Sequence, residues 1–240
     1  MRYERIVQGV FLKRVNRFIA LCGIEGKQER VHVRNTGRCA ELFLPKTQVF
    51  LQYAPAPGKK TAYTLIAIRK GRHIVNLDSL APNKLVLEFL GQGGLWPGMD
   101  EAAQALHGEV VFGDSRLDCA FTVSGRQAYA EVKGVTLEVG GKAYFPDAPT
   151  LRGVRHVREL CAARKAGALA YLILVCQMEK VESFAPNYAT HPEFAAALRE
   201  AESLGVEILA YRCRVAPDEI EMGKRIPVEL GDRSSEAWKQ

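Results

Sequence analysis

The stretch Glu109–Thr136, which reads EVVFGDSRLDCAFTVSGRQAYAEVKGVT, decides the fold of this chain. Its first half alternates, with one face made of Leu117, Cys119, Phe121 and Val123 and the other of Asp118, Ala120 and Thr122. After a turn signal at Ser124-Gly125, a second alternating run puts Glu131 and Lys133 on one face. The pattern predicts a hairpin that brings Asp118 close to Glu131 and Lys133.

Two carboxylates beside an ammonium group have a chemical use. Carboxylates hold hard divalent cations such as magnesium, which keep several waters. A bound cation lowers the pKa of its water and clamps a phosphoryl oxygen, and a lysine stabilises negative charge that develops there. The residues alone leave a second interpretation open, an ion pair on a solvated sheet face.

The same residues carry a resemblance that extends over nearly the whole chain. Asp118 followed by Glu131-Val132-Lys133 is similar to the core of the PD-(D/E)xK nuclease superfamily, and the chain more closely resembles the SfsA (sugar fermentation stimulation protein A) family. The motifs, which keep their order, are Asn35-Thr36-Gly37, Ser115-Arg116-Leu117-Asp118, Glu131-Val132-Lys133, Val135-Thr136-Leu137, Tyr144-Phe145-Pro146-Asp147-Ala148, Arg152-Gly153, His156-Val157-Arg158-Glu159-Leu160, Phe184-Ala185-Pro186 and Gly205–Tyr211.

The resemblance implies an α/β protein in which a small OB-like β-barrel precedes a restriction-endonuclease-like mixed-sheet α/β domain. We place the nucleic-acid-binding barrel at residues 1–80, the nuclease-like domain at 81–230 and a flexible tail at 231–240. The resemblance also implies a catalytic set of Glu109, Asp118, Glu131 and Lys133. Asp118 and Glu131 would bind Mg²⁺ or Mn²⁺, and Thr136, His156 and Glu159 are candidates for a supporting shell.

Charge is distributed unevenly along the chain. Residues 1–72 hold 15 Lys/Arg and 4 Asp/Glu, whereas the remainder is net negative, although the whole chain has a net charge of +6. A basic first third indicates a polyanionic partner, and OB folds bind nucleic acid on basic and aromatic faces. The candidate nucleic-acid contacts are Arg14, Arg17, Arg34, Asn35 and Arg38. Asn35 also fits a plain turn.

Composition sets further limits. No apolar run approaches the ~20 residues that span a bilayer, and no apolar stretch follows the N-terminal Met-Arg-Tyr-Glu-Arg. We therefore expect a soluble, cytoplasmic protein without a membrane partner. The six cysteines are scattered inside apolar runs without zinc-ligand spacing, so they are expected to be buried thiols. Phosphate-loop and serine-hydrolase motifs are lacking.

Periodicity in the second part predicts several elements. Helices are expected at 80–90, at 100–107 and at 151–166, the last with Thr150 as its N-cap. Residues 168–176 are apolar on both faces, which predicts a central strand covered on both sides. Thr190 and Glu193 have the spacing of a capping box that would open another helix.

These observations favour a DNA-binding protein whose metal-dependent nuclease domain hydrolyses phosphodiester bonds of DNA, RNA or both. The alternative is a non-catalytic DNA-binding regulator of sugar-utilisation genes that retains the nuclease fold. A third interpretation, an enzyme acting on a small phosphorylated sugar, has no pocket motif to support it. The sequence leaves open whether the chain forms a homodimer.

Overall fold

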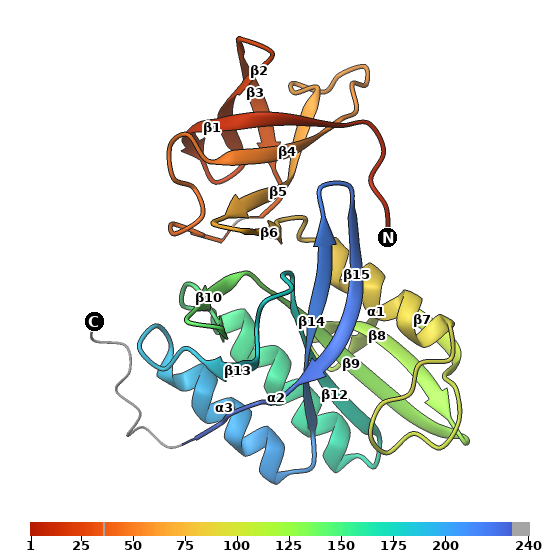
Figure 1. The fold of residues 1–240 in the computed structure, drawn as a ribbon. Coiled ribbons are helices and arrows are strands. Elements are labelled where there is room, and N and C mark those ends of the chain that lie inside the picture. Colours follow the sequence, from red (N-terminus) through yellow and green to blue (C-terminus); the bar gives the residue numbers. More distant parts are fainter. Residues whose placement is uncertain (36, 232–240) are drawn as a thin grey trace.

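The computed structural model describes residues 1–35 and 37–231 of the 240-residue chain. Figure 1 shows a β-barrel at the top and an α/β domain below it. The barrel region contains β1 (Ile6–Asn16), β2 (Ile19–Ile24), β3 (Lys27–Val33), β4 (Gln48–Tyr53), β5 (Tyr63–Lys70) and β6 (His73–Asn76).

The barrel closes through a single parallel pairing. Its strands lie in the order β3-β2-β1-β4-β5, and β3 pairs with β5 to complete the ring, while β6 extends β5. Alternating positions point inward, so that Phe11, Val31 and Leu51 are buried. Five strands closed in this order form an OB domain, which confirms the predicted barrel.

The α/β domain is built on a six-stranded mixed sheet in the order β15-β14-β12-β9-β8-β7. Its strands are β7 (Gln104–Phe112), β8 (Ser115–Val123), β9 (Arg126–Val135), β12 (Leu169–Cys176), β14 (Glu207–Ala216) and β15 (Glu219–Ile226). Strands β9, β12 and β14 run parallel, and the other three pair antiparallel. A three-stranded sheet of β10 (Leu137–Val139), β11 (Lys142–Phe145) and β13 (Ser183–Pro186) lies beside it.

Helices cover both faces of the large sheet. The first is α1 (Ala81–Gly91), and the other two are α2 (Leu151–Lys165) and α3 (Pro192–Ser203). Along β12, Leu172 and Leu174 pack in the cluster that contains α2 and α3 residues, whereas Tyr171 and Ile173 pack in the cluster that contains α1 residues. Every residue of β12 is buried, which confirms the predicted two-sided central strand.

The helix predictions had mixed outcomes. The predicted helix at 80–90 is α1, and Thr150 Oγ1 caps α2 by accepting from Gly153 N at 3.0 Å. The predicted helix at 100–107 is wrong, because residues from Gln104 onward pair with β8. The predicted capping box is also wrong: α3 has His191 as its N-cap without a side-chain hydrogen bond, and Thr190 lies in a turn closed by Asn187.

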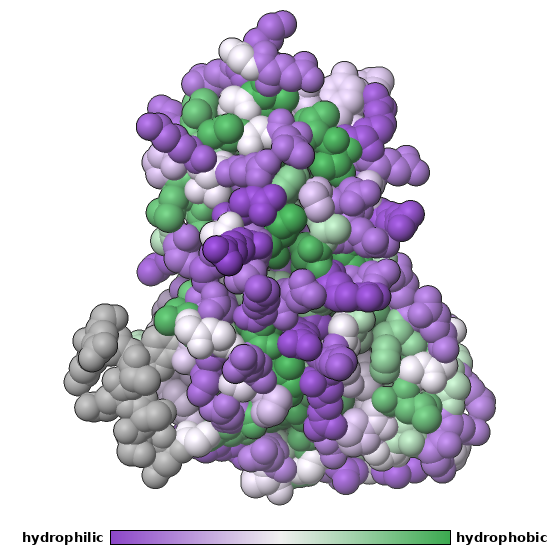
Figure 2. Space-filling model, viewed as in Figure 1, coloured by the Kyte–Doolittle hydropathy of each residue, from purple (hydrophilic) through white to green (hydrophobic). Residues whose placement is uncertain are grey.

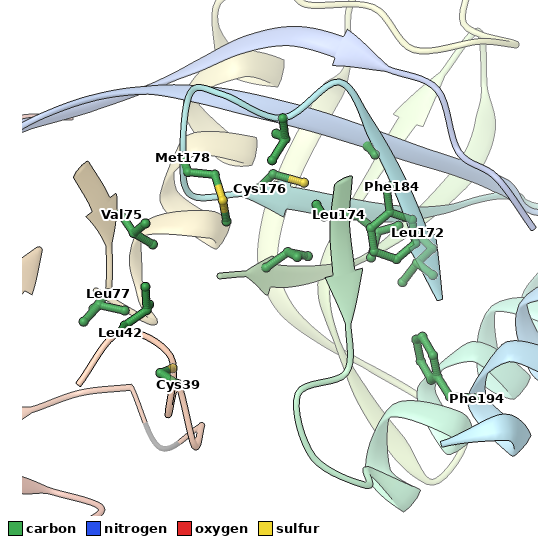
Figure 3. Close-up of a cluster of buried hydrophobic side chains, with 14 of the residues drawn as sticks. Cys39, Leu42, Val75, Leu77, Leu172, Leu174, Cys176, Met178, Phe184 and Phe194 are labelled. Carbon is green, nitrogen blue, oxygen red and sulfur yellow. The ribbon is translucent and has the colours of Figure 1, made fainter. Parts of the chain in front are cut away.

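Each of the two hydrophobic clusters contains residues of both domains. Cys39 and Leu42 of the barrel region belong to the same buried cluster as Leu77, Cys176 and Met178, and Figure 3 shows this apolar path. Buried hydrogen bonds also connect the two domains. Gln177 Nε2 donates to Asn76 Oδ1 at 2.9 Å and to Asp78 O at 3.0 Å.

A second junction involves the tip of the β14–β15 hairpin, which reaches the N-terminal segment (Figure 1). Tyr3 N donates to Asp218 O at 2.8 Å, and Arg2 pairs with Glu219 at 2.9 Å. The α/β domain therefore contacts the barrel through segments far apart in sequence.

Three further expectations concern the whole chain. All six cysteines are free and buried, as expected. Among the residues described, no helix is both long and apolar enough to cross a bilayer. The predicted tail at 231–240 lies outside the described residues, apart from Gly231.

Candidate active site

Asp118 lies where β8 and β9 stop pairing regularly. The register of the two strands runs from Val123–Arg126 to Cys119–Ala130. Beyond it, Asp118 Oδ2 accepts a hydrogen bond of 2.7 Å from Val132 N, and Asp118 Oδ1 accepts one of 2.7 Å from Asn83 Nδ2 on α1. The Asp118 carboxylate thus accepts a hydrogen bond from a backbone N–H that would otherwise donate to a carbonyl group of the neighbouring strand.

The strand changes its packing at the same point. Leu117 belongs to the cluster with α2 and α3, whereas Cys119, Phe121 and Val123 belong to the cluster with α1. The predicted single stripe of these four residues is therefore wrong at Leu117. The alternation breaks because β8 leaves its regular register with β9 at Asp118.

Glu131 is the most deeply buried member of the site. Its side chain is 1% exposed, and Oε1 binds both Lys133 Nζ and His156 Nδ1. Glu131 and Lys133 share the β9 face that looks toward α2, which is why a helix residue 25 positions later can reach the carboxylate. The other oxygen, Oε2, is buried and has no hydrogen-bond partner among the described residues.

The two carboxylates have pKa values shifted in opposite directions. Burial raises the pKa of Asp118, the charge of Glu131 adds to this, and the bonds from Val132 and Asn83 oppose it only in part. Burial also acts to raise the pKa of Glu131, but the hydrogen bond from His156 and the charge and hydrogen bond of Lys133 outweigh it and hold that pKa below its ordinary value. Carboxylates with divergent environments are typical of functional sites.

Arg152 and Asn83 support the site and were not predicted as site residues. Arg152 Nε donates to His156 Nε2 at 3.2 Å. Since a guanidinium can only donate, Nε2 must carry a lone pair, and the proton lies on Nδ1, which faces Glu131. The i, i+4 spacing of Arg152 and His156 on a helix could have indicated this contact. Asn83 precedes Asp118 by 35 residues, and no local pattern links them.

The other predicted residues lie around this cluster. Glu109 lies within β7, between two residues that pair with β8, but its side chain is 71% exposed and pairs with Arg116 at 3.3 Å. Glu159 lies against the β7–β8 turn, where Ser115 Oγ donates to it at 3.5 Å. Thr136 is buried, and its Oγ1 lies 3.6 Å from Cys39 Sγ. Neither Glu109, Glu159 nor Thr136 has a hydrogen bond to Asp118 or Glu131 in the described residues.

A cavity of about 300 Å³ lies between the two domains, at the end of β9. The barrel contributes Asn35 and Gly37 to its wall. The α/β domain contributes Gly134, which follows Lys133, and Thr136, together with residues 144–150. Its wall therefore joins the barrel loop, the end of β9 and the segment that leads into α2.

The barrel loop that lines this cavity is held by Arg14. Its four terminal N–H groups donate to the carbonyl oxygens of Arg17, Asn35, Gly37 and Arg38 at 2.7–2.9 Å, and its guanidinium lies 4.6 Å from the centre of the Phe43 ring. No terminal N–H remains for a phosphate. The structure thus gives Arg14 the role of shaping the loop.

The four other predicted nucleic-acid contacts fall into two groups. Arg34 pairs with the buried Asp78 at 2.8 Å, and Asn35 Oδ1 accepts from Gly37 N at 2.9 Å, so both take part in holding the loop and domain junction. Arg17 and Arg38 are exposed, and Arg17 stacks 4.9 Å from the ring centre of the exposed Phe18. In the view of Figure 2, hydrophilic side chains cover much of the junction between the barrel and the α/β domain.

Comparisons with known proteins agree with the two-domain architecture. A family model described as the SfsA N-terminal OB domain matches residues 12–77, and one described as the sugar fermentation stimulation protein RE domain matches residues 80–219. A sugar fermentation stimulation protein homolog from Desulfitobacterium hafniense strain Y51 is 46% identical, covering 96% of this chain and 99% of the relative. One from Ruminiclostridium cellulolyticum is 45% identical, covering 96% and 100%.

A solved structure is similar over the same length. The structure of Pyrococcus furiosus SfsA in complex with Ca²⁺ superposes with a TM-score of 0.84 and 29% sequence identity, covering 95% of this chain and 98% of the other. The similarity includes both the barrel and the α/β domain, because it leaves only a small part of either chain unmatched.

Proposed function

Since the chain belongs to the SfsA family, we propose that it binds nucleic acid and hydrolyses its phosphodiester bonds with a divalent cation, in the manner of PD-(D/E)xK nucleases. The observation that carries this proposal is the cluster of Asp118, Glu131 and Lys133 at the point where two strands diverge. An OB domain, which favours nucleic-acid binding, precedes the cluster in the chain.

The donor set fits Mg²⁺ or Mn²⁺. Across residues 1–35 and 37–231, no three His, Cys, Asp or Glu side chains gather closely enough to hold a metal ion, so the protein would supply Asp118 and Glu131 alone. Magnesium sites commonly use one or two carboxylates and complete their shell with waters and substrate phosphate. The buried, unpartnered Oε2 of Glu131 is a free ligand atom of this kind. The Ca²⁺ complex of the Pyrococcus furiosus relative supports a hard-cation site in this family.

Each residue then has a defined task. A bound divalent cation supplies charge neutralisation at the phosphoryl oxygens and a lowered pKa for water. Lys133, which is 16% exposed, presents an ammonium group that can orient the attacking water or stabilise the charge that develops on the phosphate. His156 donates through Nδ1 and keeps Glu131 in its carboxylate form. Asn83 and the Val132 N–H fix the orientation of Asp118.

The interdomain cavity supports the same proposal. It is lined by the barrel loop and by Gly134, the residue after Lys133 in the chain, so a strand held by the barrel would pass near this end of β9. Arg17 and Arg38 are the predicted barrel contacts that are free to meet phosphate. The proposed substrate is DNA, RNA or both.

A cleavage assay tests the proposal. Full-length protein is incubated with labelled single-stranded DNA, duplex DNA and RNA in Mg²⁺, Mn²⁺ or EDTA. We expect metal-dependent cleavage of at least one substrate, loss of cleavage in Asp118→Asn, and a loss of roughly 10²–10³-fold in Lys133→Ala, the range for one electrostatic contact to a transition state. Lys224→Gln, an exposed change on β15, is the matched control. Undiminished cleavage by both site variants contradicts the mechanism.

The same samples distinguish the non-catalytic regulator. A gel shift in EDTA reports binding without chemistry, and a steep loss of binding with salt reports phosphate contacts. Binding without cleavage in either metal would favour the regulator. The ion pair of Lys133 with Glu131, which balances the site internally, is the observation compatible with that alternative.

A further inference from the structure

Helix α2 carries an unpaired basic ridge on its solvent face. Arg152, Arg155 and Arg158 follow one another at three-residue spacing and are all exposed. Among the residues described, Arg155 and Arg158 make no ion pair, and Arg152 bonds only to His156. The carboxylate at i+4 from Arg155 is Glu159, but it turns toward Ser115 and the β7–β8 turn. We call these three arginines the α2 ridge.

The ridge is unfavourable for the helix itself. Like charges three residues apart repel one another. Arg152 also lies in the first turn, where the helix dipole disfavours cations and where α2 has no acidic residue. The part of the chain after residue 72 is net negative, so carboxylates are available to pair with these arginines. Two exposed arginines elsewhere do have such partners, Arg116 with Glu109 and Arg2 with Glu219, whereas isolated ones such as Arg126 have no ion pair among the described residues. An arrangement that opposes local stability points to an external ligand.

The ridge begins at the candidate active site and leads away from it. Arg152 touches His156, whose other nitrogen binds Glu131. Thr150, the N-cap of α2, lines the interdomain cavity, so the first turn of the helix stands at the edge of that cavity. Arg155 and Arg158 continue along the exposed side of the helix, which lies beside α3 in Figure 1. A chain that leaves the cavity on this side would meet three guanidinium groups in succession.

We propose that the α2 ridge is a second phosphate-binding surface, which holds the nucleic-acid backbone on the catalytic side of the cavity while the barrel holds it on the other. This inference rests on the proposed function and adds a binding surface outside the barrel. Guanidinium groups match phosphate geometry and stay charged. Contacts to phosphate fix the position of the strand without reading its sequence. The ridge therefore aligns the strand over Asp118, Glu131 and Lys133.

Binding in EDTA tests the ridge without requiring catalysis. The double variant Arg155→Gln/Arg158→Gln is compared with Arg126→Gln/Lys224→Gln, which removes the same charge from the start of β9 and from β15. Fluorescence anisotropy with a labelled single-stranded oligonucleotide and with a duplex is recorded between about 50 and 200 mM salt. Full-length protein is used throughout.

We expect the ridge variant to bind more weakly and to show a shallower salt dependence. The slope of log K against log salt should fall by roughly 0.7 for each single-strand phosphate contact removed, or by about 0.9 for a duplex. The control variant should keep the wild-type slope. The melting temperature of the ridge variant should equal or exceed that of the wild type, since a repulsive pair has been removed.

The outcomes separate the ridge from the catalytic proposal. If the wild type fails to cleave but the ridge variant still loses affinity and slope, the ridge is supported and only catalysis fails. If the ridge variant and the control variant have the same affinity and slope as the wild type, the ridge proposal is overturned whatever the cleavage assay shows. It is also overturned if the ridge variant binds oligonucleotides normally but loses binding to phosphatidylserine vesicles, because the ridge would then contact a membrane surface.

Discussion

The carboxylate of Asp118 accepts a hydrogen bond from the backbone N–H of Val132, at 2.7 Å, in the place where pairing of β8 with β9 ends. A side chain thus takes the place of a backbone acceptor in the sheet. Because Val132 directly follows Glu131, this hydrogen bond also holds Asp118 close to Glu131. Burial and the nearby Glu131 raise the pKa of Asp118, which means that its charge is held at a cost to the fold.

The first prediction concerns Asp118→Asn. In EDTA at neutral pH, the variant should melt close to the wild-type temperature, because removal of a buried charge beside Glu131 offsets the loss of one of the two hydrogen bonds that the carboxylate accepts. Mn²⁺ at 100 times its Kd should stabilise the wild type by about 2.7 kcal/mol, and the variant should lose most of this gain. Differential scanning calorimetry with and without Mn²⁺ measures both effects.

The control for this experiment is Glu109→Gln, since Glu109 is exposed and paired with Arg116. We expect it to retain the Mn²⁺ stabilisation. If Asp118→Asn gained as much from Mn²⁺ as the wild type does, Asp118 would not be a ligand. If Glu109→Gln lost the gain, Glu109 would join the site when metal binds.

The second prediction concerns Arg14→Lys. Lysine keeps the charge but cannot reproduce the planar fork that donates to four carbonyl oxygens. At about 0.5–1.5 kcal/mol for each net hydrogen bond, we expect a loss of roughly 1–3 kcal/mol in the free energy of unfolding, measured by urea denaturation. Arg17→Lys, which changes an exposed arginine in the turn that follows β1, should stay within about 0.5 kcal/mol. Equal effects of the two changes would remove the structural role given to Arg14.

Local patterns were sufficient for the elements whose contacts are mostly local. Thr150 caps α2, and the unbroken apolar run of β12 reflects burial on both faces, so both were predictable. The segment after Asp100 was predicted as helix because its composition suits one, but pairing of β7 with β8 decides its structure. Tertiary contacts often override propensity in this way.

The site was predictable in its centre and not in its surroundings. Glu131 and Lys133 share a strand face by simple alternation, so their pairing follows from sequence. The contact of Asn83 with Asp118 joins residues on different elements, 35 positions apart, and no local pattern predicts it. His156 was named as a supporting residue only through the family resemblance, and its contact with Glu131 spans 25 positions. Arg14 was predicted as a phosphate contact because it lies in a basic segment. Its contacts with carbonyl oxygens form only when the loop folds, so the sequence does not reveal them.

The third prediction concerns Gly37→Ala in the barrel loop. A Cβ atom at Gly37 would lie 2.6 Å from Asp147 Oδ2 and 2.9 Å from Asn35 Oδ1. Asp147 Oδ2 also accepts from Cys39 N at 3.3 Å, so it cannot retreat without breaking a contact between the domains. We expect a loss of about 1–3 kcal/mol in the free energy of unfolding, the usual range for overpacking. Chemical denaturation measures it.

The matched change is Gly91→Ala, at the end of α1, where an added Cβ meets no atom within 4 Å. It should be neutral or slightly stabilising, since alanine restricts the unfolded chain. Similar losses in the free energy of unfolding at both glycines would show that the close contact with Asp147 is not what disfavours alanine at position 37.

The fourth prediction concerns Glu138 and acid stability at the domain junction. Lys70 Nζ donates to Glu138 Oε2 at 2.6 Å and Gly141 N donates to Oε1 at 2.7 Å. Burial acts to raise the pKa of Glu138, but these hydrogen bonds outweigh it and place the pKa below its ordinary value of 4.5. A carboxyl group with a depressed pKa in the folded state stabilises the protein above the unfolded-state pKa and loses that effect as the pH falls through the folded-state pKa.

Glu138→Gln should therefore lower the free energy of unfolding at pH 7 by about 0.2–1 kcal/mol, the range for a partly exposed ion pair. The difference from wild type should shrink once the pH falls below 4.5 and vanish below the folded-state pKa. Urea denaturation across a pH series measures it, with Glu179→Gln, an exposed carboxylate without an ion pair in the described part of the chain, as the control. A difference that persisted unchanged into acid would mean that the side chain acts at the junction by its shape and not by its charge.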